Sequence, residues 1–162
     1  MKSRSFALAA VVLFAAAAAH ANDPKVTIAD FDARLAKLGA PKIEGTDTVG
    51  GKTVPAIYFG DRKLSNNNDV VDAVRKAHDA TATVFVKDGE EFVRVSTNVL
   101  TLEGKRGVGT ALARNAAYAS LAQGKQYRGP IDVLGTAFDA CYNPIKEAGG
   151  KVIGVSYVGH KK

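Results

Sequence analysis

The stretch that decides the fold is Thr81–Asn98, TATVFVKDGEEFVRVSTN. Two apolar runs, at residues 84–86 and 92–95, flank the pair Asp88-Gly89. An Asp-Gly pair accepts the positive φ angles that a two-residue hairpin turn requires, which makes it a strong local signal for strand pairing. The sequence therefore predicts two antiparallel strands joined at this pair.

The second strand of this hairpin carries a cation in an apolar setting, because Arg94 stands between Val93 and Val95. Side chains alternate across a strand, so one face is predicted to be apolar and the other polar, the polar face comprising Phe92, Arg94, Ser96 and Asn98. Two interpretations follow. The polar face could be a solvated outer face, or the guanidinium could line a pocket and take a small carboxylate through two parallel hydrogen bonds.

Residues 1–21 have the features of a secretory signal peptide. Two cations precede an apolar run, Phe6–Ala19, and small residues at 19 and 21 occupy the positions that a signal peptidase recognises. The competing interpretation is an uncleaved membrane anchor, but the run is shorter than the roughly 20 residues that span a bilayer. We therefore predict cleavage after Ala21 and a periplasmic or secreted domain of residues 22–162.

Charge and composition exclude several classes of protein. The net charge of +6 comes from basic residues that are scattered singly, without the basic stripe and interleaved aromatics typical of nucleic-acid binding. The single cysteine, Cys141, cannot form an internal disulfide, and its apolar neighbours favour a buried thiol over a covalent dimer. Beyond the signal peptide the histidines are His78 and His160, which we expect at the surface and not in a metal site. No cofactor is predicted.

The rest of the chain alternates between helical and strand patterns. We predict a helix within Asn22–Pro41 capped by Thr27, then a loop over Pro41–Lys52. Further helices are predicted near Val70–Ala77 and over Thr110–Ala122, and further strands at Thr53–Gly60, Tyr127–Leu134, Ala137–Ile145 and Lys151–Val158. Short turns require antiparallel neighbours.

These elements indicate one α+β domain. We expect a twisted antiparallel sheet of five to six strands with the N-terminal helix on one face. The other face becomes the wall of a ligand cleft if the connection Val99–Gly124 covers it.

Several motifs together resemble a single Cache domain, an extracytoplasmic sensor module with a PAS-like shape. They are, in order, Asn66-Asn67-Asn68 with Val71-Asp72, ATVFVKDGEEFVRVST, Val108-Gly109-Thr110, Gly124 with Tyr127-Arg128-Gly129, and YNPIKEAGGKVIGVSYVG. The resemblance covers roughly Val54–Gly159, and the closing motif is its most specific part. It implies a sheet with one pocket for a small organic molecule such as a short carboxylate, and it implies no metal or redox cofactor.

The sequence departs from the usual arrangement of that family, whose members typically sit between two membrane helices and end in a cytoplasmic output domain. Here the signal looks cleavable and the chain stops at Lys162. We expect a free-standing periplasmic binder of a small organic anion, with a membrane receptor or sensor kinase as its partner and an oligomeric state that the sequence leaves open.

Candidate pocket residues follow from the predicted faces and from the resemblance. Arg94 and Ser96 come from the hairpin, and the family motif favours Tyr142 for the pocket wall. The covering connection and its exit contribute two tyrosines and two further cations, namely Tyr118, Tyr127, Arg106 and Arg114. The alternative for each tyrosine is simple packing with its hydroxyl at the surface.

Two other functional classes compete with a small-molecule binder. An enzyme would need a nucleophile with a base, a carboxylate pair in a cleft, or a metal. Ser96, Asp139 and Cys141 lie in predicted strands, but no histidine is near them in sequence, so we predict no catalytic residues. The remaining alternative is an accessory protein that modulates a membrane receptor and has its cleft filled by side chains.

Overall fold

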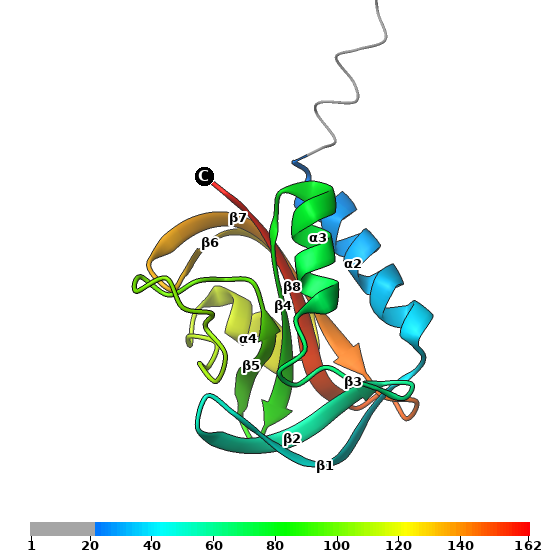
Figure 1. Ribbon diagram of the computed structural model, residues 1–162. Helices are drawn as coiled ribbons and strands as arrows, with labels where there is room; N and C mark the ends of the chain where they lie inside the picture. The colour runs from blue at the N-terminus through cyan, green and yellow to red at the C-terminus, as the bar shows by residue number, and fades with distance from the viewer. Residues whose placement is uncertain (1–21) are drawn as a thin grey trace, which may run out of the picture.

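The computed structural model describes residues 22–162, so the predicted signal peptide lies outside it. Its helices and strands, in chain order, are α2 (Pro24–Leu38), β1 (Pro41–Val49), β2 (Lys52–Phe59), β3 (Arg62–Lys63), α3 (Asp69–His78), β4 (Thr81–Asp88), β5 (Glu91–Thr97), α4 (Ala116–Ala122), β6 (Tyr127–Val133), β7 (Thr136–Lys146) and β8 (Val152–Lys161). This is the predicted α+β class (Figure 1). None of the helices within residues 22–162 is long and apolar enough to cross a bilayer.

The main sheet has five strands in the order β5-β4-β8-β7-β6, and every neighbouring pair is antiparallel. The predicted hairpin forms β4 and β5. Its two loop residues are Gly89 and Glu90, one position later than predicted, because Asp88 pairs with Glu91 at the end of the ladder. Gly89 has a φ of 58°, so the glycine takes the first loop position, as in a type II′ turn.

One face of this sheet packs against α2 and α3, which lie side by side in Figure 1. Helical spacing places Ile28, Phe31 and Leu35 on one side of α2, and all three are buried. They share a core with the strand residues that point to this face, including Ala82, Val84, Val86, Val93, Val95, Cys141 and Val158.

The opposite face is covered by the connection between β5 and β6, which contains α4. Leu112, Ala117 and Leu121 from this connection form a second core with Phe85, Phe92, Phe138, Tyr142, Val155 and Tyr157 of the sheet. The predicted helix over Thr110–Ala122 was wrong in its first half, because residues 110–112 hydrogen-bond to the outer edge of β5. The helix begins only after Asn115, whose side chain accepts from the backbone N–H of Tyr118 at 3.1 Å.

A second, small sheet of order β1-β2-β3 lies across one end of the main sheet, at the bottom of Figure 1. The loop predicted over Pro41–Lys52 was wrong, because residues Pro41–Val49 form β1. The prediction of strand Thr53–Gly60 is confirmed by β2. β1 is exposed along most of its length and pairs only with β2, so it lacks the apolar alternation by which strands are recognised.

Three further predictions concern single residues. Asp23, and not Thr27, caps α2, accepting from the backbone of Lys25 at 2.9 Å. Cys141 is a free and buried thiol, as predicted. The surface position predicted for His160 was wrong, because its side chain is buried and shares a 2.9 Å hydrogen bond with Thr27.

Candidate ligand-binding site

Arg94 of β5 is buried beneath the β5–β6 connection, with only 3% of its surface exposed. It pairs with Phe85 of β4, and its guanidinium carbon lies 4.9 Å from the centre of the Phe85 ring. Nη1 donates to Thr110 Oγ1 at 3.0 Å and to the carbonyl oxygen of Ala111 at 3.2 Å. Nε is buried and has no partner within residues 22–162. The hydrogen-bonding capacity of this guanidinium is therefore only partly used.

Within the part of the chain that the structure describes, no carboxylate pairs with Arg94. None of the ion pairs formed within residues 22–162 includes it, and both of its acceptors are neutral. Burial lowers the pKa of Arg94, while Tyr142 and Tyr157 act in the opposite direction. An arginine nevertheless stays charged in a protein. The site is thus a buried positive charge that lacks an anion, an arrangement that costs free energy unless a partner is supplied.

Tyr142 of β7 provides a second unused polar group close to Arg94. It is fully buried, and its hydroxyl has no hydrogen-bond partner within residues 22–162. Its ring stands 4.7 Å from that of Tyr157, whose hydroxyl shares a 3.0 Å bond with Thr81 Oγ1. Burial raises the pKa of Tyr142 and of Tyr157 well above the usual range. Both remain neutral phenols at physiological pH, so Tyr142 can donate a hydrogen bond to an anion.

A surface groove with a volume of about 450 Å³ lies over this buried layer. It is lined from the connection and the β6–β7 turn by Thr101, Leu102, Glu103, Lys105, Arg106, Gly107, Val108, Thr110 and Leu134. Thr110 links the groove to the interior, because its hydroxyl accepts the bond from Arg94. Gly107 lies close to both, since a Cβ atom there would lie 2.7 Å from Leu134 Cδ1 and 3.7 Å from Arg94 Cδ. The groove therefore lies beside the buried guanidinium, although Arg94 and Tyr142 are not among the residues that line it.

The other two candidate arginines already have carboxylate partners. Arg106 lines the groove, but its Nη1 and Nη2 contact the two oxygens of Asp72 at 2.8 and 2.9 Å. Arg114 lies at the surface, where its Nη2 meets Glu91 at 2.6 Å. Hydrogen bonding to these carboxylates raises the pKa of each arginine. Among the three predicted cations, Arg94 alone has no acidic partner within residues 22–162.

The hydroxyls of two candidate tyrosines bond to backbone carbonyl oxygens and not to Arg94. Tyr118 donates to the carbonyl oxygen of Glu90 at 2.7 Å and shares a separate surface pocket of about 300 Å³ with Arg114. Tyr127 donates to the carbonyl oxygen of Pro130 at 2.8 Å. Its ring packs edge-on against Tyr142, with 6.0 Å between the ring centres. Tyr127 therefore supports the wall of the buried layer rather than offering a polar contact.

Ser96 requires a correction, because it does not share a sheet face with Arg94. Arg94 pairs with Phe85 and Ser96 pairs with Val84, so a β-bulge lies between them. Phe85 and Val84 are successive residues and point to opposite faces. Ser96 is buried and donates to the carbonyl oxygen of Asn67 at 2.6 Å, which leaves it a structural role.

Sequence reasoning missed three residues of this layer, namely Phe85, Thr110 and Tyr157. The signal available for Tyr157 was its place in the closing strand, two residues from Val155 and on the same face of the sheet. Within residues 22–162, no three His, Cys, Asp or Glu side chains are gathered so that they could hold a metal ion.

Comparison with known proteins agrees with the fold and with the resemblance seen in the sequence. Residues 26–162 match the Cache 3/Cache 2 fusion domain family. Neither the curated proteins nor the solved structures gave a match. Cache domains are extracytoplasmic modules that sense small molecules, usually within membrane receptors, and they are not enzymes. The chain belongs to the Cache 3/Cache 2 fusion domain family.

Proposed function

We propose that residues 22–162 act outside the cytoplasm as a sensor of a short organic carboxylate, with Arg94 as its main charge contact. The observation that carries this proposal is that Arg94 is buried with neutral partners only. A ligand carboxylate supplies the missing negative charge. The family supports small-molecule sensing in general, and the arginine narrows the chemistry to an anion.

The edge of the Arg94 guanidinium formed by Nε and Nη2 favours a planar anion that accepts two parallel hydrogen bonds. Both side-chain hydrogen bonds of Arg94 within residues 22–162 come from Nη1, whereas Nε has no partner there. A carboxylate engages Nε and Nη2 together through two parallel bonds. The hydroxyl of Tyr142 is available for a further bond to the same anion. The ligand must be small, because the rings of Phe85, Tyr142 and Tyr157 already pack within this layer.

A thermal-shift screen tests the proposal. Short mono- and dicarboxylates are compared with their neutral amides on wild-type protein and on Arg94→Gln, with Arg106→Gln as the matched control. A ligand at 100 times its Kd stabilises the folded state by about 2.7 kcal/mol. We expect at least one acid, and not its amide, to raise the Tm of wild type and of Arg106→Gln but not of Arg94→Gln. Equal shifts in wild type and Arg94→Gln contradict the role of Arg94.

The accessory-protein alternative is supported by exposed apolar residues on the connection. Leu102 is 85% exposed and lines the groove, and Leu100 is 48% exposed on the same connection. Contiguous exposed apolar residues are typical of a surface that contacts a protein partner, whereas single ones are common on any protein. If no acid in the screen stabilises wild-type protein, the result counts against carboxylate sensing and favours the accessory role.

A further inference from the structure

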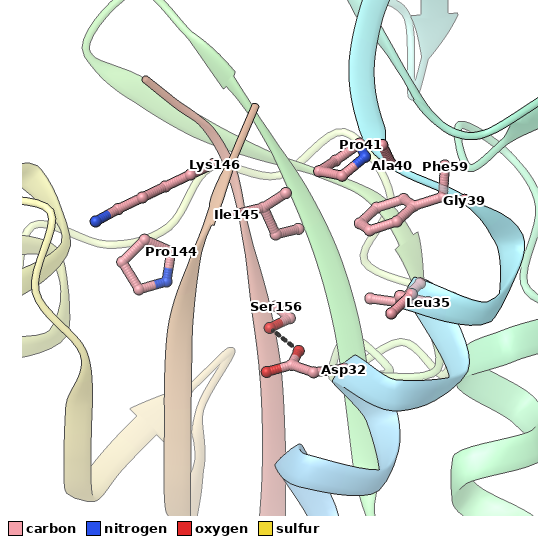
Figure 2. Close-up of a pocket in the computed structure, with 11 residues that line it drawn as sticks. Asp32, Leu35, Gly39, Ala40, Pro41, Phe59, Pro144, Ile145, Lys146 and Ser156 are labelled. Atoms are coloured by element: carbon pink, nitrogen blue, oxygen red, sulfur yellow. Dashed lines mark hydrogen bonds between the residues drawn. The ribbon is translucent and has the colours of Figure 1, made fainter. Parts of the chain in front are cut away.

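A second groove lies on the opposite face of the main sheet, between α2 and the strands β7 and β8 (Figure 2). Its volume is about 390 Å³, within the range of small-molecule sites. Leu35 of α2, Phe59 of β2 and the pair Pro144-Ile145 of β7 supply apolar walls. Asp32 and Ser156 supply the polar part, and Figure 2 shows their side chains facing one another.

The polar part of this groove is rich in acceptors. Asp32 Oδ1 accepts from Ser156 Oγ at 2.6 Å, and Asp32 Oδ2 accepts from Asn143 Nδ2 at 2.6 Å. The remaining oxygen of this set, Asn143 Oδ1, is buried without a partner in residues 22–162. Every carboxylate oxygen can accept a further bond. A ligand that complements this site should therefore carry hydrogen-bond donors.

The carboxylate of Asp32 also has no cationic partner among the described residues. None of the ion pairs within residues 22–162 includes Asp32, although its neighbour on the helix, Asp30, contacts both Arg34 and His78. Lys146 lines the same groove, but in Figure 2 its side chain extends away from Asp32. A carboxylate in an apolar groove with neutral partners attracts a cation more strongly than one in open water.

We propose that this groove binds the ammonium group of a small organic amine with an apolar body. The ammonium supplies three N–H donors and a positive charge for Asp32. The apolar body packs against Leu35, Phe59 and Ile145. This site is independent of Arg94, because the sheet separates the two cores. The protein would then recognise an amine on its helical face and an acid under the β5–β6 connection.

The probe is 2-phenylethylammonium, with 2-phenylethanol as its neutral counterpart of the same shape. Calorimetry gives the affinity, and amide chemical shifts of ¹⁵N-labelled residues 22–162 locate the contact. We expect the amine to perturb residues around Asp32 and Ser156, and the alcohol to bind at least tenfold more weakly. Equal binding of amine and alcohol overturns the proposal, as does the absence of amine binding.

Two substitutions separate the charge from the shape of the groove. Asp32→Asn removes the charge, and the free oxygen of Asn143 can accept from the new amide, so the fold is retained. Ala36→Trp fills the groove from an exposed position on α2 and leaves Asp32 in place. Each should weaken amine binding at least tenfold, whereas Arg94→Gln should not change it. Unchanged amine affinity in both groove variants overturns the proposal.

Discussion

Replacing Tyr142 with phenylalanine should stabilise the free protein. The hydroxyl of Tyr142 is buried without a partner in residues 22–162, and a buried polar group in that state costs about 1–3 kcal/mol. Phenylalanine keeps the ring that packs on Tyr157 at 4.7 Å and removes only the hydroxyl. We therefore expect Tyr142→Phe to raise the free energy of unfolding by about 1 kcal/mol or more.

Tyr157→Phe is the matched control, because Tyr157 is equally buried on the same face of the sheet. Its hydroxyl shares a 3.0 Å bond with Thr81 Oγ1, so its removal loses a bond. Thr81 keeps its bond to the carbonyl oxygen of Gly159, which limits the loss to about 0.5–1.5 kcal/mol.

Urea unfolding of the two variants tests whether the Tyr142 hydroxyl lacks a hydrogen-bond partner. The free energy of unfolding should be higher than wild type in Tyr142→Phe and lower in Tyr157→Phe, so that the two variants differ by about 2 kcal/mol. This difference corresponds to about 1 M between their urea midpoints. The same Tyr142→Phe protein should bind the acid ligand more weakly, since it has lost a donor. If Tyr142→Phe lowers the stability as much as Tyr157→Phe does, the Tyr142 hydroxyl has a partner and is not held free for a ligand.

Three further predictions concern other parts of the chain. Burial raises the pKa of the Cys141 thiol, so native protein should react slowly with thiol reagents. It should also form no disulfide dimer on non-reducing gels. Rapid labelling of the native protein would contradict a buried thiol. Burial lowers the pKa of His160, so the unfolded state binds more protons than the native state below about pH 6.5. The contribution of His160 to stability should therefore be complete above that pH and should fall with acidification. In His160→Gln, the urea midpoint should depend less on pH between pH 7 and pH 5. Intact mass of the exported protein should correspond to a chain that begins at Asn22, and a membrane-bound protein that keeps residues 1–21 would refute cleavage.

The main sheet could be predicted from the sequence because its strands carry the usual signals. Strands β4, β5 and β8 are apolar runs bounded by turns and are buried on both faces, whereas β7 is buried at Phe138, at 140–142 and at Ile145. Strand β1 could not be recognised, because most of its side chains are exposed and only pairing with β2 defines it. The start of α4 was also unpredictable, since Thr110 and Leu112 bond to the edge of β5.

The candidate site was predictable in its charge but not in its geometry. Arg94 stood out because a cation lay between two valines, and the structure buries it. The bulge that separates Ser96 from Arg94 has no local signal, because alternation alone assumes an unbroken strand. The acids that neutralise Arg106 and Arg114, Asp72 and Glu91, lie 34 and 23 residues away in sequence, and only the fold brings them together.

Calorimetric titration of a short carboxylate into wild-type, Arg94→Ala and Arg106→Ala protein tests the role of Arg94 most directly. A two-pronged contact contributes on the order of 2–4 kcal/mol, so Arg94→Ala should weaken the affinity by roughly 30- to 1,000-fold. Arg94→Lys should recover only part of the loss, because an ammonium cannot form the fork. Arg106→Ala should bind nearly as well as wild type, since Arg106 is already paired with Asp72. An unchanged affinity in a folded Arg94→Ala protein would contradict the assignment of Arg94 as the anion-binding residue.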